Sequence, residues 1–420
     1  MGSLPGVIRG HYRFLEQTFA TQGPIFELDL GLLEALVVGD AEAAEDIFVK
    51  KARNYDKGGD FWDSLRDLLG DGIGASEGEL WRRQHKLMQP GFRRSAIDGY
   101  RPMIDDTIRS ALDDLTLDEP LDVARWCDDL LSLLTVRILL GSDAPLSLIR
   151  QVRESMSILF ATALPEMVLR KLPRWLPRPG RARLKRARKL VDDTLMAIIA
   201  DKRRRGAGDD LLGSLIHATD EDGAMSDEQL RAEAIFLYTA GYETTGASLA
   251  WTLLLLARHP ALLAELQAEL DTSTDDRTLL RACIQEGLRL YPPGAIIPRR
   301  AVADDVLGGH AVKADTLIFV CPWLIHRDPR WWPQPHDFDP ARFLDGESSP
   351  SRPRLAWSPF GAGQRICLGK GLALLELERA LELIVTRFTP APADDGPAPD
   401  ARMSTTLKPS KPIRLALQPR

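Results

Sequence analysis

A cysteine in a glycine-rich loop is the residue with the clearest potential for chemistry in this sequence. Cys367 lies in the stretch Phe360-Gly361-Ala362-Gly363-Gln364-Arg365-Ile366-Cys367-Leu368-Gly369. Apolar residues recur at steps of three and four over 368–388, which predicts a helix with one buried face. Unpaired backbone N–H groups at the start of that helix favour a thiolate, and glycines let the chain close around a bulky group. A thiolate with the cation Arg365 beside it indicates a ligand for a large anionic metal cofactor.

A long apolar helix, predicted over 226–259, has polar residues at its centre. A Ser-x-x-Gln capping box begins it and a proline follows its end. Burying an acid and two hydroxyls in such a helix carries a cost. Ala240 or Gly241 and Thr244 share one face, where a flat group could approach closely. A kinked helix with a capped acid explains the same residues, since a threonine hydroxyl can bond back to the backbone. The central residues are Ala240-Gly241-Tyr242-Glu243-Thr244-Thr245.

Two further pairs have a spacing that suggests a role. Trp81 and His85 are four residues apart and share a helix face, so their N–H groups could hold a carboxylate. A half-buried tryptophan beside a solvated histidine is the alternative. Glu286 and Arg289 form a Glu-x-x-Arg pair, but the pattern alone is weak because ordinary surface helix pairs match it. The other matches are Glu79/Arg82, Glu228/Arg231 and Glu376/Arg379.

Composition narrows the class of protein. The chain has 420 residues, 44% of them hydrophobic, and a formal net charge of −6, which argues against a nucleic-acid partner. Its four cysteines have no paired spacing, so we expect no disulfide framework and a reducing, cytoplasmic location. No signal peptide or membrane-spanning run is evident. The basic stretch 170–189 leaves a membrane-surface contact open beside the alternative of a solvated helix face.

The remaining pattern predicts a mainly α-helical chain with small β-sheets, an α+β fold. With no repeat and no convincing linker, we expect one domain over residues 1–420, helix-rich with β-rich N-terminal and C-terminal parts. Helices are expected at 40–51, 277–290 and throughout 100–206, and a partly helical loop at 56–78. Strands are expected at 25–30, 36–38, 296–302 and 316–321, and a hairpin at 306–312. A Pro/Ala/Asp loop at 389–400 is expected to precede a last strand pair, 401–407 with 413–417.

Together these motifs resemble the cytochrome P-450 superfamily of haem-thiolate monooxygenases. The loop fits the signature Phe-x-x-Gly-x-Arg-x-Cys-x-Gly, and the centre of the long helix fits the oxygen-activation motif. Among the Glu-x-x-Arg pairs, Glu286/Arg289 is the one in the family's place, before Pro-Pro. The resemblance covers the chain from about residue 23 to the C-terminal strands. It implies the P-450 fold, with the haem between the long central helix and the helix after the cysteine loop.

The resemblance also implies residue roles. Cys367 would be the axial ligand of the iron of heme b, and Thr244 with Glu243 would relay protons to activated oxygen. Glu286 and Arg289 would lock to Arg342 of the segment that precedes the loop. Arg299 competes with Arg300 for a propionate, and His85 stands where the family often has arginine. The other implied haem contacts are Arg365, Phe360, Trp81, His85, Arg300, Ala240 and Gly361.

The implied function is insertion of one atom of O₂ into a hydrophobic small molecule, by hydroxylation or epoxidation. We expect no fused reductase, so NAD(P)H electrons would arrive through a separate ferredoxin or flavodoxin with its reductase, and we expect a monomer. The basic residues that resemble a docking face, or are plain solvated charges, are Arg82, Arg83, Lys86, Arg93, Arg94 and Lys370. Candidate pocket residues are Phe61, Trp62, Leu65, Ile235, Phe236, Ala295, Ile296, Ile297 and Thr406.

These pocket residues are apolar or small and offer no charge to pin a carboxylate. A terpene, polyketide or fatty-acyl chain of secondary metabolism is therefore the expected kind of substrate. Two other classes stay open. A haem-thiolate sensor without turnover would have little reason to carry Glu243 and Thr244. A cysteine hydrolase would need a base near Cys367, and no nearby histidine is evident.

Overall fold

The computed structural model describes residues 4–29, 31, 34–141, 151–156, 158–159, 180–206, 208, 210–272, 276–347, 351–403 and 406–420. Its contacts divide the chain into two compact units. The larger unit comprises Met1–Tyr55, Arg101–Leu130 and Thr244–Arg420, and the smaller unit comprises Asp56–Tyr100 and Leu131–Glu243. The described residues are mainly helical with small sheets, which confirms the predicted fold class. The single domain over residues 1–420 stays a prediction.

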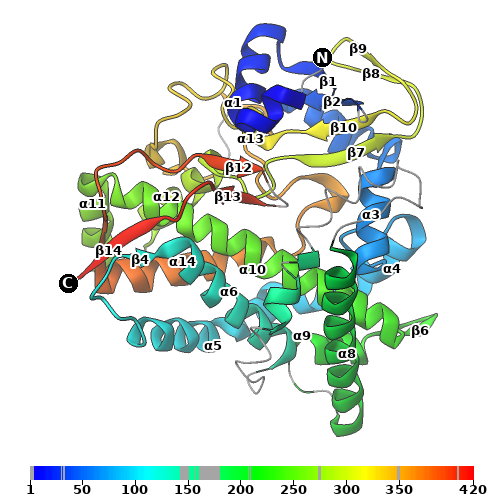
Figure 1. Ribbon diagram of the computed structural model, residues 1–420, viewed down its shortest axis with the longest axis horizontal. Helices are drawn as coiled ribbons and strands as arrows, with labels where there is room; N and C mark the ends of the chain where they lie inside the picture. Colours follow the sequence, from blue (N-terminus) through cyan, green and yellow to red (C-terminus); the bar gives the residue numbers. More distant parts are fainter. Residues whose placement is uncertain are drawn as a thin grey trace. The chain divides into compact units, whose positions relative to one another are not determined.

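A five-stranded sheet lies at the N-terminal end of the larger unit (Figure 1). Strand β2 pairs antiparallel with β1 and parallel with β10, and β10 pairs antiparallel with β7. Helices α1 (Leu4–Gln22) and α13 (Pro322–Ile325) lie beside these strands, and the rings of Tyr12 and Trp323 are 4.4 Å apart. In order, the strands are β1 (Ile25–Asp29), β2 (Glu34–Val38), β10 (Leu317–Val320), β7 (Ile297–Ala301) and β3 (Tyr55–Asp56). The predicted hairpin forms as β8 (Asp305–Leu307) and β9 (His310–Val312).

The other helices of the larger unit position the cysteine loop. Helix α2 (Ala41–Glu45) begins at Asp40, whose carboxylate accepts the N–H groups of Glu42 and Ala43, and continues as a π-helical turn, Asp46–Lys50. Helices α11 (Pro260–Leu270), α12 (Thr278–Leu290) and α14 (Lys370–Arg387) pack against one another. Short 3-10 turns, Pro340–Phe343 and Gly363–Arg365, precede α14.

The C-terminal strands differ from the prediction. Strand β11 (Phe388–Pro392) occupies the start of the expected loop and pairs with β14 (Arg414–Pro419), which also pairs with β4 (Leu121–Asp122). Strand β12 (Ala401–Met403) pairs with β13 (Leu407–Pro409), so the predicted pairing of 401–407 with 413–417 is wrong. The prolines of β11 favoured a loop over a strand in the sequence analysis. They are tolerated because β11 is an edge strand, where one row of N–H groups has no ladder partner.

Helix α10 (Asp227–Ala257) is the longest helix described, and its 31 residues correspond to about 46 Å at the standard rise. The predicted capping box forms: Ser226 Oγ accepts the Gln229 N–H, and Gln229 Oε1 accepts the Ser226 N–H. The helix is continuous through 240–245. The hydroxyls of Thr239, Ser248 and Thr252 donate to the carbonyl four residues earlier.

The smaller unit is built from helices and one short hairpin. Arg83 of α4 donates to both carboxylate oxygens of Asp220 and to the Gly223 carbonyl, which fixes that hairpin to α4. The basic stretch 170–189 lies outside the described residues except for 180–189, where α8 begins. The elements are α3 (Asp60–Leu69), α4 (Gly78–Met88), α8 (Arg181–Arg205), α9 (Leu211–His217), β5 (Thr219–Asp220) and β6 (Gly223–Ala224). Helices α5 (Arg94–Asp113), α6 (Val123–Leu140) and α10 contain the divisions between the units.

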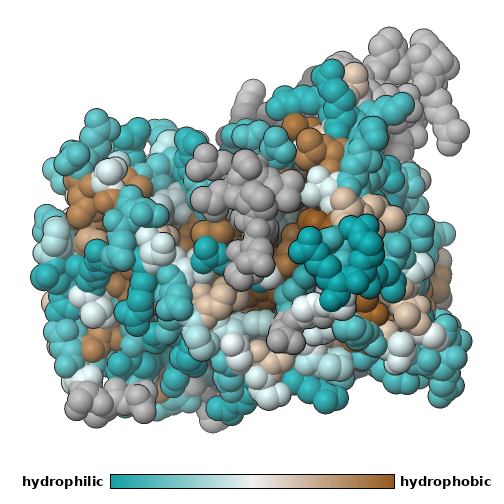
Figure 2. Space-filling model, turned by 90° about the horizontal axis from the view of Figure 1, so that it is seen from below, coloured by the Kyte–Doolittle hydropathy of each residue, from teal (hydrophilic) through white to brown (hydrophobic). Residues whose placement is uncertain are grey.

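No single helix in the part of the chain that the structure describes is long and apolar enough to span a membrane. Helices α10 and α11 reach the required length and composition only as a pair, and that pair bends by 110°. On the face drawn in Figure 2, hydrophilic side chains cover most of the surface and hydrophobic ones form separate groups.

Candidate active site

The cysteine loop is closed by its own backbone. The Cys367 N–H donates to the Phe360 carbonyl at 2.9 Å, and the Gly361 N–H donates to the Ser358 carbonyl at 3.0 Å. Gly363 has φ +68°, and a Cβ there would lie 2.0 Å from the Phe48 carbonyl oxygen. Only glycine fits this position. The loop is therefore held in register against the π-helical turn that contains Phe48.

The Cys367 thiol is exposed, whereas the other three cysteines are buried. Protein atoms crowd the sulfur on its remaining sides and raise its pKa by desolvation, although the N–H groups of Gly369 and Lys370 and the Lys370 charge act in the opposite direction. The helix-start effect expected from the sequence is thus present but outweighed. A lone accessible sulfur that receives backbone N–H groups is a donor suited to haem iron.

Lys370 is the cation that the sequence reading undervalued. Its ammonium donates to Glu347 at 2.9 Å and lies 5.7 Å from the ring centres of both Trp357 and Phe360. Arg365 is half-buried in the 3-10 turn that precedes Cys367. Lys370 occupies the first position of α14, a signal that the sequence does contain. The Phe360 ring packs against Trp357 at 6.4 Å.

The centre of α10 has one accessible face. Ala240 is exposed and Gly241 and Thr244 are half-buried, while Glu243 is only 5% exposed. These three accessible residues are the ones whose spacing predicted a shared face for a flat group. Thr244 accepts the Ser248 hydroxyl at its carbonyl. The arrangement fits the approach of a haem to α10.

Neighbouring arginines on β7 point in different directions, as strand alternation requires. Arg299 is 6% exposed, lies over the Phe48 ring at 5.1 Å and donates to the Pro298 carbonyl. Arg300 is half-buried and lies 3.4 Å from Asp315, which is itself exposed. Arg299 therefore lies on the same turn that supports the cysteine loop, whereas Arg300 reaches toward a surface carboxylate.

Pocket candidates of the larger unit lie near Leu407, the first residue of β13, whose backbone is held by hydrogen bonds. Leu407 donates its N–H to the Pro293 carbonyl and accepts Trp251 Nε1 at its own carbonyl. Ala295 and Thr406 are buried on either side of this contact, and Thr406 Oγ1 has no hydrogen-bond partner among the described residues. Ile296 packs against the adjacent core cluster. The Ile297 side chain comes within 4.0 Å of where a Cβ on Gly361 would be.

The candidates of the smaller unit divide into separate contacts. The Trp81 and His85 rings are 5.1 Å apart, and Phe61 meets Trp62 edge-on at 5.2 Å. Leu65 is buried. Adjacent positions on α10 face different partners. Phe236 covers Gly72 and Gly74, where added Cβ atoms would clash with its ring, and Ile235 lines an apolar cavity of about 20 Å³ together with Val136, Leu195 and Tyr238.

Two acids are buried that the sequence did not predict to be so. Glu233 was not singled out, and the interpretation of Glu376 as part of a surface Glu376/Arg379 pair is wrong, because Glu376 is buried and Arg379 pairs with Asp105 and Glu382. Glu233 of α10 accepts the Ile73 N–H at 2.8 Å, and burial raises its pKa to about 8. Glu376 of α14 is also buried, which raises its pKa to about 8 while the nearby Thr245 hydroxyl acts in the opposite direction. An acid flanked by leucines, as in Leu375-Glu376-Leu377, was the available signal.

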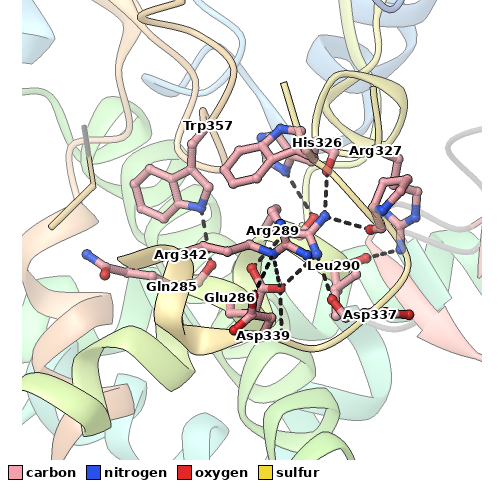
Figure 3. Close-up of polar contacts among 12 residues, drawn as sticks. Gln285, Glu286, Arg289, Leu290, His326, Arg327, Asp337, Asp339, Arg342 and Trp357 are labelled. Carbon is pink, nitrogen blue, oxygen red and sulfur yellow. Dashed lines mark hydrogen bonds and ion pairs between the residues drawn. The ribbon is translucent and has the colours of Figure 1, made fainter. Parts of the chain in front are cut away.

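The structure brings Glu286, Arg289 and Arg342 together (Figure 3). The Glu286–Arg289 pair is fully buried, with two parallel bonds of 2.6 and 2.7 Å. Arg342 Nε lies 3.4 Å from Glu286 Oε1, which also accepts the Asp339 N–H. Arg289 donates further to the carbonyls of His326, Pro335 and Asp337. This cluster therefore fixes the irregular segment before the cysteine loop onto α12.

Comparisons with known proteins agree with this geometry. The family described as Cytochrome P450 matches residues 1–417. Cyclooctatin synthase from Streptomyces melanosporofaciens is 30% identical over 95% of this chain and 89% of its own, and cyclooctat-9-en-7-ol 5-monooxygenase from the same organism is 31% identical over 87% and 82%. Pentalenene oxygenase from Streptomyces avermitilis is 29% identical over 96% and 92%. The crystal structure of the cytochrome P450DA heme domain superimposes with a TM-score of 0.86 over 99% of this chain and 95% of that chain, at 22% identity.

The chain therefore belongs to the cytochrome P450 family and has its fold, and it is a haem-dependent monooxygenase. This confirms the class that the motifs predicted. The residues present fit a haem: an accessible sulfur that receives backbone N–H groups, a buried arginine nearby, and an accessible small-residue face on α10. Which side chain contacts which part of the haem remains a proposal.

The buried acid of the Glu-x-x-Arg pair should matter far more than its surface counterpart. Replacing Glu286 by Ala leaves the Arg289 charge buried without its anion, so we expect the free energy of unfolding to fall by about 3–5 kcal/mol. Glu79→Ala is the matched control, because Glu79 and Arg82 form the same pair on the exposed side of α4. Urea unfolding should show a large loss for the first and little change for the second. Equal effects would contradict a special role for burial.

Proposed function

We propose that this protein is a heme b monooxygenase that inserts one atom of O₂ into a neutral hydrophobic molecule by hydroxylation or epoxidation. The observation that carries the proposal is the exposed Cys367 sulfur, held where the N–H groups of Gly369 and Lys370 face it. A bound haem, held by the Cys367 sulfur, would supply the oxygen-activating chemistry. The protein's own contribution is to hold the sulfur, orient the substrate and deliver protons.

Cys367 would ligate the haem iron, and Phe360 and Gly361 of the same loop would contact the haem. Ala240, on the accessible face of α10, would also contact it. The propionates would be bound by Arg365, by Arg300 or Arg299, and by the Trp81–His85 pair. The burial of Arg299 beside the cysteine loop supports it over Arg300.

Thr244 and Glu243 would hold and move protons at the accessible face of α10. A hydroxyl on the accessible face of α10 can donate a hydrogen bond there, and a neighbouring buried carboxyl can resupply the proton. The half-buried side chain of Thr244 and the buried one of Glu243 support this division of roles. The alternative, a haem-thiolate sensor, would bind haem and not turn over.

The substrate would be a terpene, polyketide or fatty-acyl compound. The pocket candidates Ala295, Ile296 and Ile297 are apolar, and Thr406 adds one uncommitted hydroxyl. Two Streptomyces relatives are named for an unsaturated hydrocarbon, pentalenene, and an unsaturated cyclic alcohol, cyclooctat-9-en-7-ol. These names favour a terpene-like ring compound over a charged substrate.

Electrons from NAD(P)H would arrive through a ferredoxin or flavodoxin with its reductase, and the protein would work as a monomer. Arg94 is almost fully exposed and pairs with Asp98 only at the long distance of 3.8 Å, so it can still attract an acidic partner. Arg83 is engaged with Asp220 and Lys370 with Glu347, so they contribute less. Added salt should slow reduction by such a partner. A rate that does not change with ionic strength would contradict electrostatic docking.

The ligand assignment is tested by the absorption spectrum of the reduced protein with CO. We expect the strongly red-shifted Soret band of a thiolate-ligated haem, and we expect Cys367→Ala to lose it because the sulfur is removed. Cys321→Ala is the control, since that thiol is buried elsewhere in the core. If Cys367→Ala keeps the band, another residue is the ligand.

Turnover separates enzyme from sensor in the same preparation. With added redox partners and a substrate found by its spectral shift, NADPH consumption should yield oxygenated product. Thr244→Ala should lower product per electron by about 100-fold, the lower range for a positioned proton donor. Thr244→Ser keeps the hydroxyl and should retain most of the coupling. Full coupling in Thr244→Ala would contradict the proposed relay.

The two arginines of β7 can be distinguished by haem retention. Arg299→Gln should weaken haem binding about tenfold or more if this buried guanidinium holds a propionate, since hydrogen bonds to charged groups contribute about 1.5–3 kcal/mol. Arg300→Gln removes a contact with the exposed Asp315 and should leave retention nearly unchanged. Transfer of haem to an excess of apomyoglobin measures both. The reverse order would assign the propionate to Arg300.

A further inference from the structure

His326 lies between α12 and the segment that leads into the cysteine loop. Its side chain is fully buried. Nε2 accepts the Ser358 N–H at 2.9 Å, and Nδ1 lies 3.2 Å from the Arg289 carbonyl. Because a backbone N–H can only donate and a carbonyl can only accept, the network assigns the ring hydrogen to Nδ1. Both ring nitrogens are used, and the imidazole is neutral.

One end of this connection is Arg289, a buried arginine with several hydrogen bonds. Arg289 donates Nη1 to the His326 carbonyl at 2.8 Å, while the His326 ring donates back to the Arg289 carbonyl. Arg289 is itself fully buried against Glu286. Figure 3 shows the imidazole directly beside this cluster. His326 is thus fixed in position and in tautomer from the α12 side.

The other end begins the turn that holds Cys367. The Ser358 N–H donates to the His326 ring, and the Ser358 carbonyl accepts the Gly361 N–H. Phe360, two residues after Ser358, accepts the Cys367 N–H. Trp357 donates to the Gln285 carbonyl and provides a parallel tie to α12. Hydrogen bonds therefore connect Arg289 to Cys367 through His326, with only a short stretch of backbone between them.

We propose that His326 is a positioning residue for the haem ligand: as a neutral imidazole, it ties the turn that holds Cys367 to the buried Glu286–Arg289 pair. The inference rests on the proposed role of Cys367 and goes beyond it. The contact that matters is the one from Nε2 to the Ser358 N–H. If Nε2 were protonated, its N–H would face the Ser358 N–H, and the hydrogen bond between them would be lost. Acid is therefore expected to release the turn from the ring.

The surroundings of the ring oppose that proton. Arg289 of α12 and Arg327, next in the chain, are both cationic, and on the side toward the loop the ring accepts the uncharged backbone N–H of Ser358. Burial, and then these charges, lower the pKa of His326 to about 3 from its ordinary 6.5. The released state takes up the proton at the ordinary pKa. The tie is therefore complete above about pH 6.5 and weakens as the pH falls below it.

Two substitutions separate the two ring contacts. His326→Gln places an amide oxygen near the position of Nε2 and can accept the Ser358 N–H. His326→Asn places an amide N–H₂ near the position of Nδ1 and can donate only to the Arg289 carbonyl. Both amides are uncharged over the pH range tested. We expect Asn to speed the loss of the thiolate–CO Soret band about tenfold, the ratio for one unmade buried hydrogen bond, and Gln to restore most of the difference.

The pH dependence of the rate at which the thiolate–CO Soret band is lost provides a second measurement. A merely structural role of His326 would not change it. In the wild-type holoprotein the rate should rise by up to tenfold per pH unit between about 6.5 and 5, because one proton is taken up on release. His326→Gln should show a flat profile in this window. Thermal unfolding followed by circular dichroism, which needs no haem spectrum, should show the same loss of pH dependence. Equal rates for Gln and Asn, or parallel profiles for Gln and wild type, would overturn the proposal.

The outcomes also distinguish the positioning role of His326 from the proposed role of Cys367 as the haem ligand. If the wild-type protein has no thiolate–CO band, the assignment of Cys367 fails, while the pH dependence of unfolding still tests the His326 tie. If the band is present and lost in Cys367→Ala but His326 variants leave it unaffected, only the positioning role fails. Should both variants fold poorly, the wild-type pH profile alone decides: a flat rate between pH 6.5 and 5 contradicts the role of His326.

Discussion

The larger unit depends on a buried ion pair between Glu286 and Arg289. The carboxylate oxygens and the guanidinium nitrogens of this pair all take part in hydrogen bonds. Glu286 and Arg289 lie one helical turn apart, so α12 itself presents them to each other. Taking both out of water is costly, and it is tolerated only because additional groups satisfy the remaining donors and acceptors. Those groups come from the irregular chain between β10 and the cysteine loop, including Asp337 and Asp339. Charge satisfaction thus gives a segment with little regular secondary structure a single conformation.

The cysteine loop draws its geometry from this arrangement and from the N-terminal π-helical turn. Gly363 presses against the Phe48 carbonyl, and Phe48 in turn lies under the Arg299 guanidinium. The sulfur is therefore placed by backbone contacts on both sides. Its electrostatic surroundings are more balanced than a helix start suggests, because crowding and the N–H groups shift the pKa of Cys367 in opposite directions.

The sequence was sufficient for the family and for most elements because its signals are local. Spaced motifs, the capping box of α10 and apolar periodicity each involve residues within a few turns of one another. Pairing between distant strands was not predictable in the same way. The prolines in β11 indicated a loop, and only the tertiary position of that strand at a sheet edge makes them acceptable.

The same limit applied to the candidate site. The choice between Arg299 and Arg300 depends on which face of β7 is covered, which no pattern in Pro298-Arg299-Arg300 reveals. His326 went unnoticed because a histidine after an apolar run is ordinary in sequence. Its importance comes from Arg289 and Ser358, which lie 37 and 32 residues away.

The start of β13 at Leu407 separates the stability of the proposed pocket wall from its shape. Both polar groups of the Leu407 backbone are committed, one to Pro293 and one to Trp251, whose ring stacks on Tyr291 at 3.9 Å. The adjacent Thr406 side chain makes no such commitment among the described residues. Natural selection can therefore change the size and polarity at position 406 while the chain path stays constant. A wall built in this way lets related enzymes diverge in substrate choice by single replacements, without first acquiring compensating changes elsewhere in the fold.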